Sequence, residues 1–147
     1  MTYNTTSSLS PNMPTPPTSY DLVISNGRVI DPANGLDAQL DIAISGGKIA
    51  AVESNIDTSA TKRVVDATGL VVTPGLIDLH VHAAAGIRKP MGDDFMVAPD
   101  TAGVSAGVTT ILDAGSTGAL NVGGMVNYLA SHATTRLMAL INIGKMG

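Results

Sequence analysis

Apolar residues in the first half of the chain fall into short runs separated by turn-forming residues, a pattern typical of β-strands. Strands are predicted at residues 22–24, 28–30, 41–45, 48–53, 64–65 and 70–72. The pair Asn26-Gly27 lies between two of these runs and predicts a β-hairpin, and Gly46-Gly47 predicts a second one. Turns are expected at residues 31–35 and at Thr68-Gly69. Residues 20–73 are therefore predicted to form a small unit of β-strands.

The pattern changes after Pro74, where apolar runs alternate with stretches that suit helices. Strands are predicted at residues 76–82, 107–113 and 136–143, helices at 100–106 and 121–132, and a loop at 115–118. Asp100 is a candidate N-cap of the first helix. Alternating strands and helices favour right-handed crossovers and a parallel sheet, so residues 74–147 are predicted to be an α/β unit.

Three parallel strands with two helices form an incomplete architecture. A closed (β/α)8 barrel needs about 250 residues, and an open three-stranded sheet would leave an apolar edge exposed. We therefore expect this chain to be an incomplete fragment, the N-terminal piece of a longer protein. Residues 1–19 are rich in Ser, Thr, Asn and Pro and carry no charged side chain, which predicts a disordered tail.

Composition narrows the classes of function. Lysine and arginine total only 8 and the formal net charge is -4, so no basic surface for a nucleic acid is expected. Cysteine is absent, which excludes disulfides and thiolate metal sites and favours a reducing compartment. The sequence shows no signal peptide and no stretch suited to a transmembrane helix, so we expect a cytoplasmic protein without a membrane partner.

The segment His80-Val81-His82 carries the clearest chemical signal in the chain. Side chains of a strand alternate between its two faces, so His80 and His82 should point the same way, as should Asp78. Two neighbouring imidazoles on rigid backbone are suited to binding a metal ion. The surrounding apolar residues favour a buried site rather than a surface patch.

With these motifs in place, residues 20–147 resemble the amidohydrolase superfamily. The resemblance rests on residues 26–32, 41–44, 47–52, 66–69, 74–82, 107–110 and 113–116. It implies a metal-dependent (β/α)8, or TIM, barrel, of which residues 74–147 are the first three β/α units. The barrel would be preceded by part of a small composite β-sandwich, formed by residues 20–73.

The resemblance also implies a set of site residues. His80 and His82 would bind the more buried of one or two divalent metal ions, with zinc the expected metal. The other ligands and the general-base aspartate belong to later barrel strands, beyond residue 147, so no catalytic residue is expected within this chain. Asp78 is expected to pack near or support a histidine, and Asp113 to cap a loop or take part in catalysis. Asn142 ends the third strand and is a candidate either to support the site or to contact substrate.

The resemblance points to a hydrolase of amide, N-acyl or acyl-ester bonds that uses a metal-activated water. The loops at residues 83–86 and 113–118 are similar to those of the deacetylase subgroup, which resembles D-aminoacylases. Dihydroorotases usually carry an arginine where this chain has Ala84, which argues against true dihydroorotase activity. The substrate would be a small acylated amine or amide.

Three alternatives stay open: a dihydroorotase- or hydantoinase-type cyclic amidohydrolase, a truncated chain without activity, and a split enzyme completed by a second chain. A homo-oligomer is also compatible with the sequence.

Overall fold

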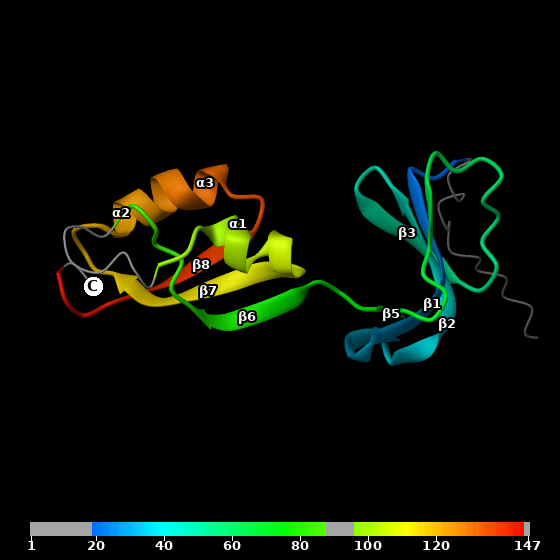
Figure 1. The fold of residues 1–147 in the computed structure, drawn as a ribbon, viewed down its shortest axis with the longest axis horizontal. Coiled ribbons are helices and arrows are strands. Elements are labelled where there is room, and N and C mark those ends of the chain that lie inside the picture. The colour runs from blue at the N-terminus through cyan, green and yellow to red at the C-terminus, as the bar shows by residue number, and fades with distance from the viewer. Residues whose placement is uncertain (1–18, 88–95, 146–147) are drawn as a thin grey trace, which may run out of the picture. The chain divides into compact units, whose positions relative to one another are not determined.

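The structure is a computed structural model that describes residues 19–87 and 96–145 (Figure 1). The chain divides into two compact units between Thr73 and Pro74. The predicted disordered tail lies outside the described residues, except for Ser19. Within the described ranges, no helix combines the length and the apolar character that a bilayer span requires.

The first unit is a five-stranded sheet, and each of its strands contains Val or Ile, residues that favour strands. The strands are β1 (Leu22–Asp31), β2 (Leu36–Ser45), β3 (Lys48–Glu53), β4 (Val64–Asp66) and β5 (Val71–Val72). The order is β3-β2-β1-β4, with neighbours β1, β2 and β3 antiparallel. Both β4 and β5 pair with β1 in parallel. The predicted hairpin at Gly46-Gly47 is confirmed, because both glycines have positive φ and join β2 to β3.

The predicted hairpin at Asn26-Gly27 is wrong, because β1 continues through this pair. Asn26 has a φ of 62°, and the β1–β2 register shifts between Ile24 and Gly27, which marks a β-bulge. The Asn26 amide donates to Asp41 Oδ1 at 2.8 Å, and its side-chain Nδ2 donates to Asp66 Oδ1 at 3.1 Å. Side chains distant in sequence thus stabilise the left-handed residue inside a strand. The chain reverses later, at η1 (Pro32–Asn34).

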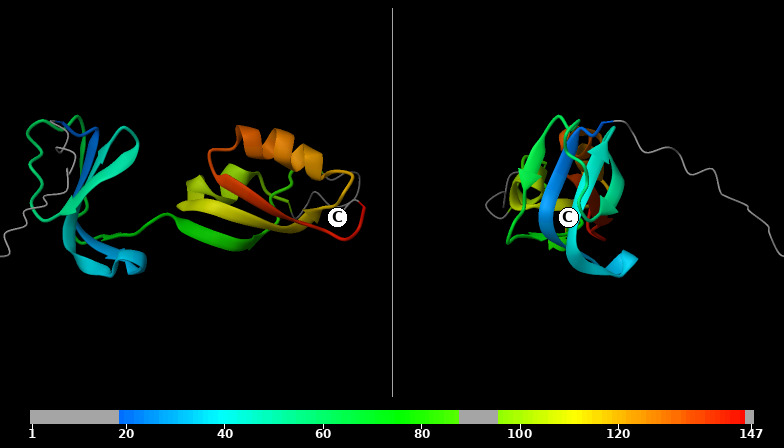
Figure 2. Two further views of the ribbon diagram at one scale, coloured as in Figure 1. Left: turned by 180° about the vertical axis from the view of Figure 1, so that it is seen from behind. Right: turned by 90° about the vertical axis from the view of Figure 1, so that its right-hand side faces the viewer.

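The second unit is a parallel sheet in the order β6-β7-β8, as the alternating pattern predicted. Its strands are β6 (Leu76–Val81), β7 (Val108–Thr117) and β8 (Arg136–Ile141). The helical segments are α1 (Pro99–Ala102), η3 (Val104–Ala106), α2 (Val122–Gly124), the π-helical η4 (Met125–Leu129) and α3 (Ala130–His132). Figures 1 and 2 show these segments on one face of the sheet. No barrel is closed by the described residues.

Two local predictions in this unit are wrong. The strand β7 runs to Thr117, so most of the loop predicted at residues 115–118 belongs to a strand, although its register against β8 is irregular there. Ala98 occupies the N-cap position of α1, and Asp100 lies in the first turn instead. The Asp100 carboxylate accepts hydrogen bonds from the Thr135 amide at 2.8 Å and the Thr134 amide at 3.1 Å, just before β8.

Burial differs between the central strand of this sheet, β7, and the two outer strands. Ile111 on β7 and Met125 in η4 are at most 1% exposed, and they mark the core beneath the helical layer. Large apolar side chains of the outer strands are exposed, among them Leu76, Ile77, Leu79, Met138, Leu140 and Ile141. The helical layer therefore covers only part of the apolar surface of the sheet.

Acid is expected to remove the contribution of Asp100 to stability. Hydrogen bonds from the Thr135 amide, and then from Thr134, lower the pKa of Asp100 below its usual value. Because its pKa is lower in the folded state, its stabilisation is present above the pKa of the unfolded chain, about 3.9, and disappears as the pH falls through the folded-state pKa. Asp100→Asn should unfold at lower urea concentration than wild type at pH 7. The difference should shrink below about pH 4. A pH-independent difference would contradict this assignment.

Candidate metal centre

Polar side chains from all three strands of the second unit lie at or near the carboxyl ends of those strands. His80 is the next-to-last residue of β6 and His82 follows the strand, whereas Asn142 follows β8. Asp113 lies within β7, opposite Val81, the last residue of β6. Because the strands are parallel, their carboxyl ends lie along the same edge of the sheet. In parallel α/β folds, ligands bind outside the carboxyl ends of the strands.

The two imidazoles lie next to each other, as strand alternation predicted. Their ring centroids are 5.6 Å apart and the ring planes meet at 81°. The carboxylate of Asp78 accepts a hydrogen bond from the His80 backbone amide at 2.9 Å. This contact lies where the β6–β7 register shifts, between Asp78 and Val81, so Asp78 holds the backbone rather than the ring of His80.

The expectation of a buried pair is wrong for the residues that the structure describes, because both histidines are exposed. Their apolar neighbours on β6 share this exposure, with Leu76 at 57% and Leu79 at 70%. A further layer of the protein could bury these apolar side chains of β6, but only if its residues pack against the strand.

A chain of hydrogen bonds connects the end of β6 to β7. The Nδ1 atom of His82 lies 2.8 Å from the Ser116 Oγ atom. The Ser116 amide donates to Asp113 Oδ1 at 2.7 Å, and the Ala83 amide donates to Asp113 Oδ2 at the same distance. Asp113 is fully buried and Ser116 is 2% exposed. Asp113 therefore holds together the two backbone segments that position His82 and Ser116.

Asn142 links the last part of β7 to the segment that follows β8, at the same edge. Its Nδ2 donates to the Gly115 carbonyl at 3.1 Å, and its Oδ1 accepts from the Gly144 amide at 2.8 Å. Both polar ends of this side chain are thus engaged with the backbone.

The sequence did not predict that Ser116 contacts the ring of His82. The available signal is the spacing Asp113-x-x-Ser116, in which an aspartate accepts from an amide three residues later. The φ of +88° at Gly115 allows this tight arrangement. The partnership of Ser116 with His82 spans 34 residues, and local sequence patterns do not reveal it.

The donor atoms fit part of a metal site. Imidazole nitrogens suit zinc, and zinc sites in proteins use three or four protein ligands. Within the described ranges, no group of three histidine, cysteine, aspartate or glutamate side chains could hold a metal ion. The histidine pair can therefore supply two nitrogens, and further ligands would have to come from other residues.

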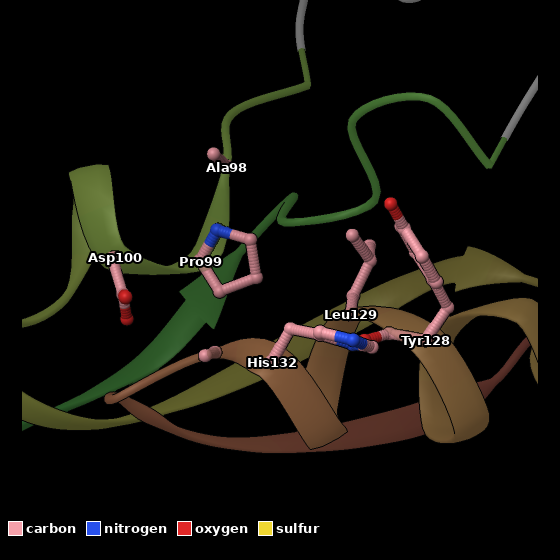
Figure 3. A pocket seen from close by; sticks show the side chains of 7 residues that line it. Ala98, Pro99, Asp100, Tyr128, Leu129 and His132 are labelled. Carbon is pink, nitrogen blue, oxygen red and sulfur yellow. The ribbon is translucent and has the colours of Figure 1, made fainter.

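A separate pocket of about 210 Å³ lies in the helical layer and does not include the histidine pair (Figure 3). It is lined by Ala98, Pro99, Asp100, Tyr128, Leu129, His132 and Ala133. The Asp100 carboxylate is held by amides that precede β8, which places the pocket toward the amino ends of the strands. The His132 Nδ1 atom lies 2.7 Å from the Tyr128 carbonyl, within its own helix. These contacts stabilise the fold, and we assign no function to this pocket.

Comparison with known proteins identifies two kinds of similar enzyme. A deacetylase of Agrobacterium fabrum is 35% identical over 133 residues, which cover 89% of this chain and 31% of the relative. A dihydroorotase of Streptococcus thermophilus is 54% identical over 61 residues, which cover 42% of this chain and 14% of the relative.

Solved structures agree with these relatives. A crystal structure of a dihydroorotase superposes with a TM-score of 0.71 at 34% identity, over 84% of this chain and 31% of that protein. The chain thus spans less than a third of the length of these relatives. A comparison with protein-family models found no match.

Proposed function

Because this chain belongs to the amidohydrolase superfamily, we propose that its full-length protein is a metal-dependent hydrolase of amide or N-acyl bonds. The observation that carries the proposal is the pair of imidazoles at the carboxyl end of β6, with ring centroids 5.6 Å apart. The deacetylase relative supports the same class of reaction, because it aligns over 89% of this chain.

His80 and His82 would hold one divalent metal ion, and zinc is the ion that best suits two neutral imidazoles. When bound there, such an ion would polarise the substrate carbonyl and lower the pKa of a water molecule. Asp78 would keep the His80 backbone in place through its contact of 2.9 Å. Further ligands and the general-base aspartate would come from parts of the barrel beyond residue 147.

Asp113 and Asn142 would hold backbone segments of the site in place rather than transfer protons. Both carboxylate oxygens of Asp113 accept backbone hydrogen bonds, and the carboxylate is fully buried. The amide group of Asn142 is likewise engaged at both ends. Each side-chain polar atom of both residues has a backbone partner in the described structure, so we assign the two residues to the support of the site.

The substrate that we favour is an acyclic N-acyl amine, as a deacetylase would use. Ala84 is fully buried and its carbonyl accepts from the Ile87 amide at 3.0 Å, so this position offers no cationic group to a substrate carboxylate. Hydrolysis of a cyclic amide is the second candidate, because the dihydroorotase of Streptococcus thermophilus is 54% identical over 61 residues. A cytoplasmic location and a homo-oligomer remain predictions.

Metal removal tests the proposal directly. Full-length protein treated with a chelator should lose hydrolysis of N-acetylated amino acids, and added Zn²⁺ should restore it, because the proposed reaction needs a metal ion held by the two imidazoles. A matched assay with dihydroorotate separates the two candidate substrates. Full activity in protein shown to be metal-free would refute the metal-dependent mechanism.

A further inference from the structure

The two histidines of the pair differ in their surroundings. The Nδ1 atom of His82 lies 2.8 Å from Ser116 Oγ. No side chain among the described residues hydrogen-bonds to the ring of His80, which instead contacts the ring of His82. One imidazole is thus fixed by a neighbour across the sheet, and the other is not.

The position of Ser116 is set by buried groups. Its side chain is 2% exposed, and its amide donates to Asp113 Oδ1 at 2.7 Å. The other oxygen of this carboxylate accepts from the Ala83 amide, the residue directly after His82. The backbone on both sides of the His82–Ser116 contact is therefore bound to the buried Asp113 carboxylate, which keeps the hydroxyl and the ring close together.

This contact leaves one nitrogen of His82 for a metal. Because Ser116 occupies the Nδ1 side of the ring, only Nε2 is open to a ligand. A neutral imidazole carries its proton on one nitrogen and a lone pair on the other, and a serine hydroxyl can either donate or accept. Coordination through Nε2 requires that the proton lie on Nδ1, so that Nδ1–H donates a hydrogen bond to Ser116 Oγ.

We propose that Ser116 is a positioning residue that holds His82 in the Nδ1–H tautomer, with its Nε2 lone pair directed to the metal. This inference rests on the proposed function, because it takes His82 to be a metal ligand. Ser116 itself touches neither metal nor substrate. Its hydroxyl fixes the tautomer and orientation of the His82 ring in the metal-free protein, and Asp113 keeps the hydroxyl in place.

The test measures the tautomer in metal-free, full-length protein labelled with ¹⁵N in histidine. At about pH 8.5, where histidine is neutral, ¹H–¹⁵N correlation spectra report which nitrogen carries the proton. Wild-type His82 should be the Nδ1–H form. Ser116→Ala should shift His82 toward the Nε2–H form and weaken Zn²⁺ binding by about 10- to 100-fold.

Two variants distinguish the hydrogen bond from a general packing effect. Ser116→Thr keeps the hydroxyl and should retain the Nδ1–H form. Thr117→Val removes a neighbouring buried hydroxyl, which contacts Met125 Sδ at 3.9 Å rather than a histidine, and should leave both the tautomer and Zn²⁺ affinity unchanged.

The outcomes separate this inference from the proposed function. His82→Ala with unchanged Zn²⁺ affinity would show that His82 is not a ligand. If His82→Ala lowers the affinity while wild-type His82 is the Nε2–H form, the role of Ser116 is wrong and the metal site stands. The same conclusion follows if Ser116→Ala alters neither the tautomer nor the affinity. The wild-type spectrum decides the tautomer even if a variant fails to fold.

Discussion

His80→Ala in the full-length protein is expected to empty the metal site and to reduce hydrolysis by more than about 100-fold, because loss of groups that merely support a ligand already costs about 10- to 100-fold. The substitution removes one of two imidazoles at the end of β6, whose ring centroids lie 5.6 Å apart. His80 is exposed in the described structure, so its removal leaves no cavity in the core. Metal content and turnover, measured on the same preparation, should fall together while the unfolding temperature of the metal-free protein stays unchanged.

His132→Ala provides the matched control for this prediction. His132 is also exposed, and its Nδ1 lies 2.7 Å from the Tyr128 carbonyl in the helical layer, away from β6. This variant should keep both metal and turnover. Near-wild-type turnover of His80→Ala with a full complement of metal would show that the histidine pair is not the metal site.

Local patterns predict the elements whose type is set by residues close together in the sequence. The parallel strands, the helical segment at residues 122–132 and the hairpin at Gly46-Gly47 all follow from the spacing of apolar residues and from turn chemistry. Asn26-Gly27 has the same turn chemistry but forms a bulge, because Asp41 and Asp66 bind Asn26 from other strands. A dipeptide signal cannot report partners that are 15 and 40 residues away.

The candidate site, like the fold, could be predicted only where neighbouring residues of one strand determine it. The alternation of side chains along a strand brings His80 and His82 together, and the ring contact agrees with it. The roles of Asp113 and Ser116 depend on contacts between β6 and β7, across 30 and 34 residues. Burial of the pair could not be read from the strand either, since it depends on what packs against β6.

Asp113→Ala is expected to cause the largest loss of stability in the second unit. Asp113 is fully buried and accepts hydrogen bonds from the Ala83 and Ser116 amides, each at 2.7 Å. Alanine would leave both buried amides without this acceptor, and each orphaned donor costs about 1–3 kcal/mol, or about 2–6 kcal/mol together. Asp113→Asn retains one acceptor oxygen and should lose roughly half as much. Urea unfolding of the three proteins measures both differences.

Asp41→Ala separates loss of stability from loss of the site. Asp41 is 7% exposed and accepts from the Asn26 and Ile56 amides at 2.8 and 2.9 Å, so it performs the same task in the first unit. Both alanine variants should be destabilised by comparable free energies. Only Asp113→Ala should also weaken Zn²⁺ binding, because Asp113 anchors Ser116 beside His82. Equal loss of Zn²⁺ affinity in both variants would mean that the site responds to global stability, and unchanged stability of Asp113→Ala would refute its role as the link between β6 and β7.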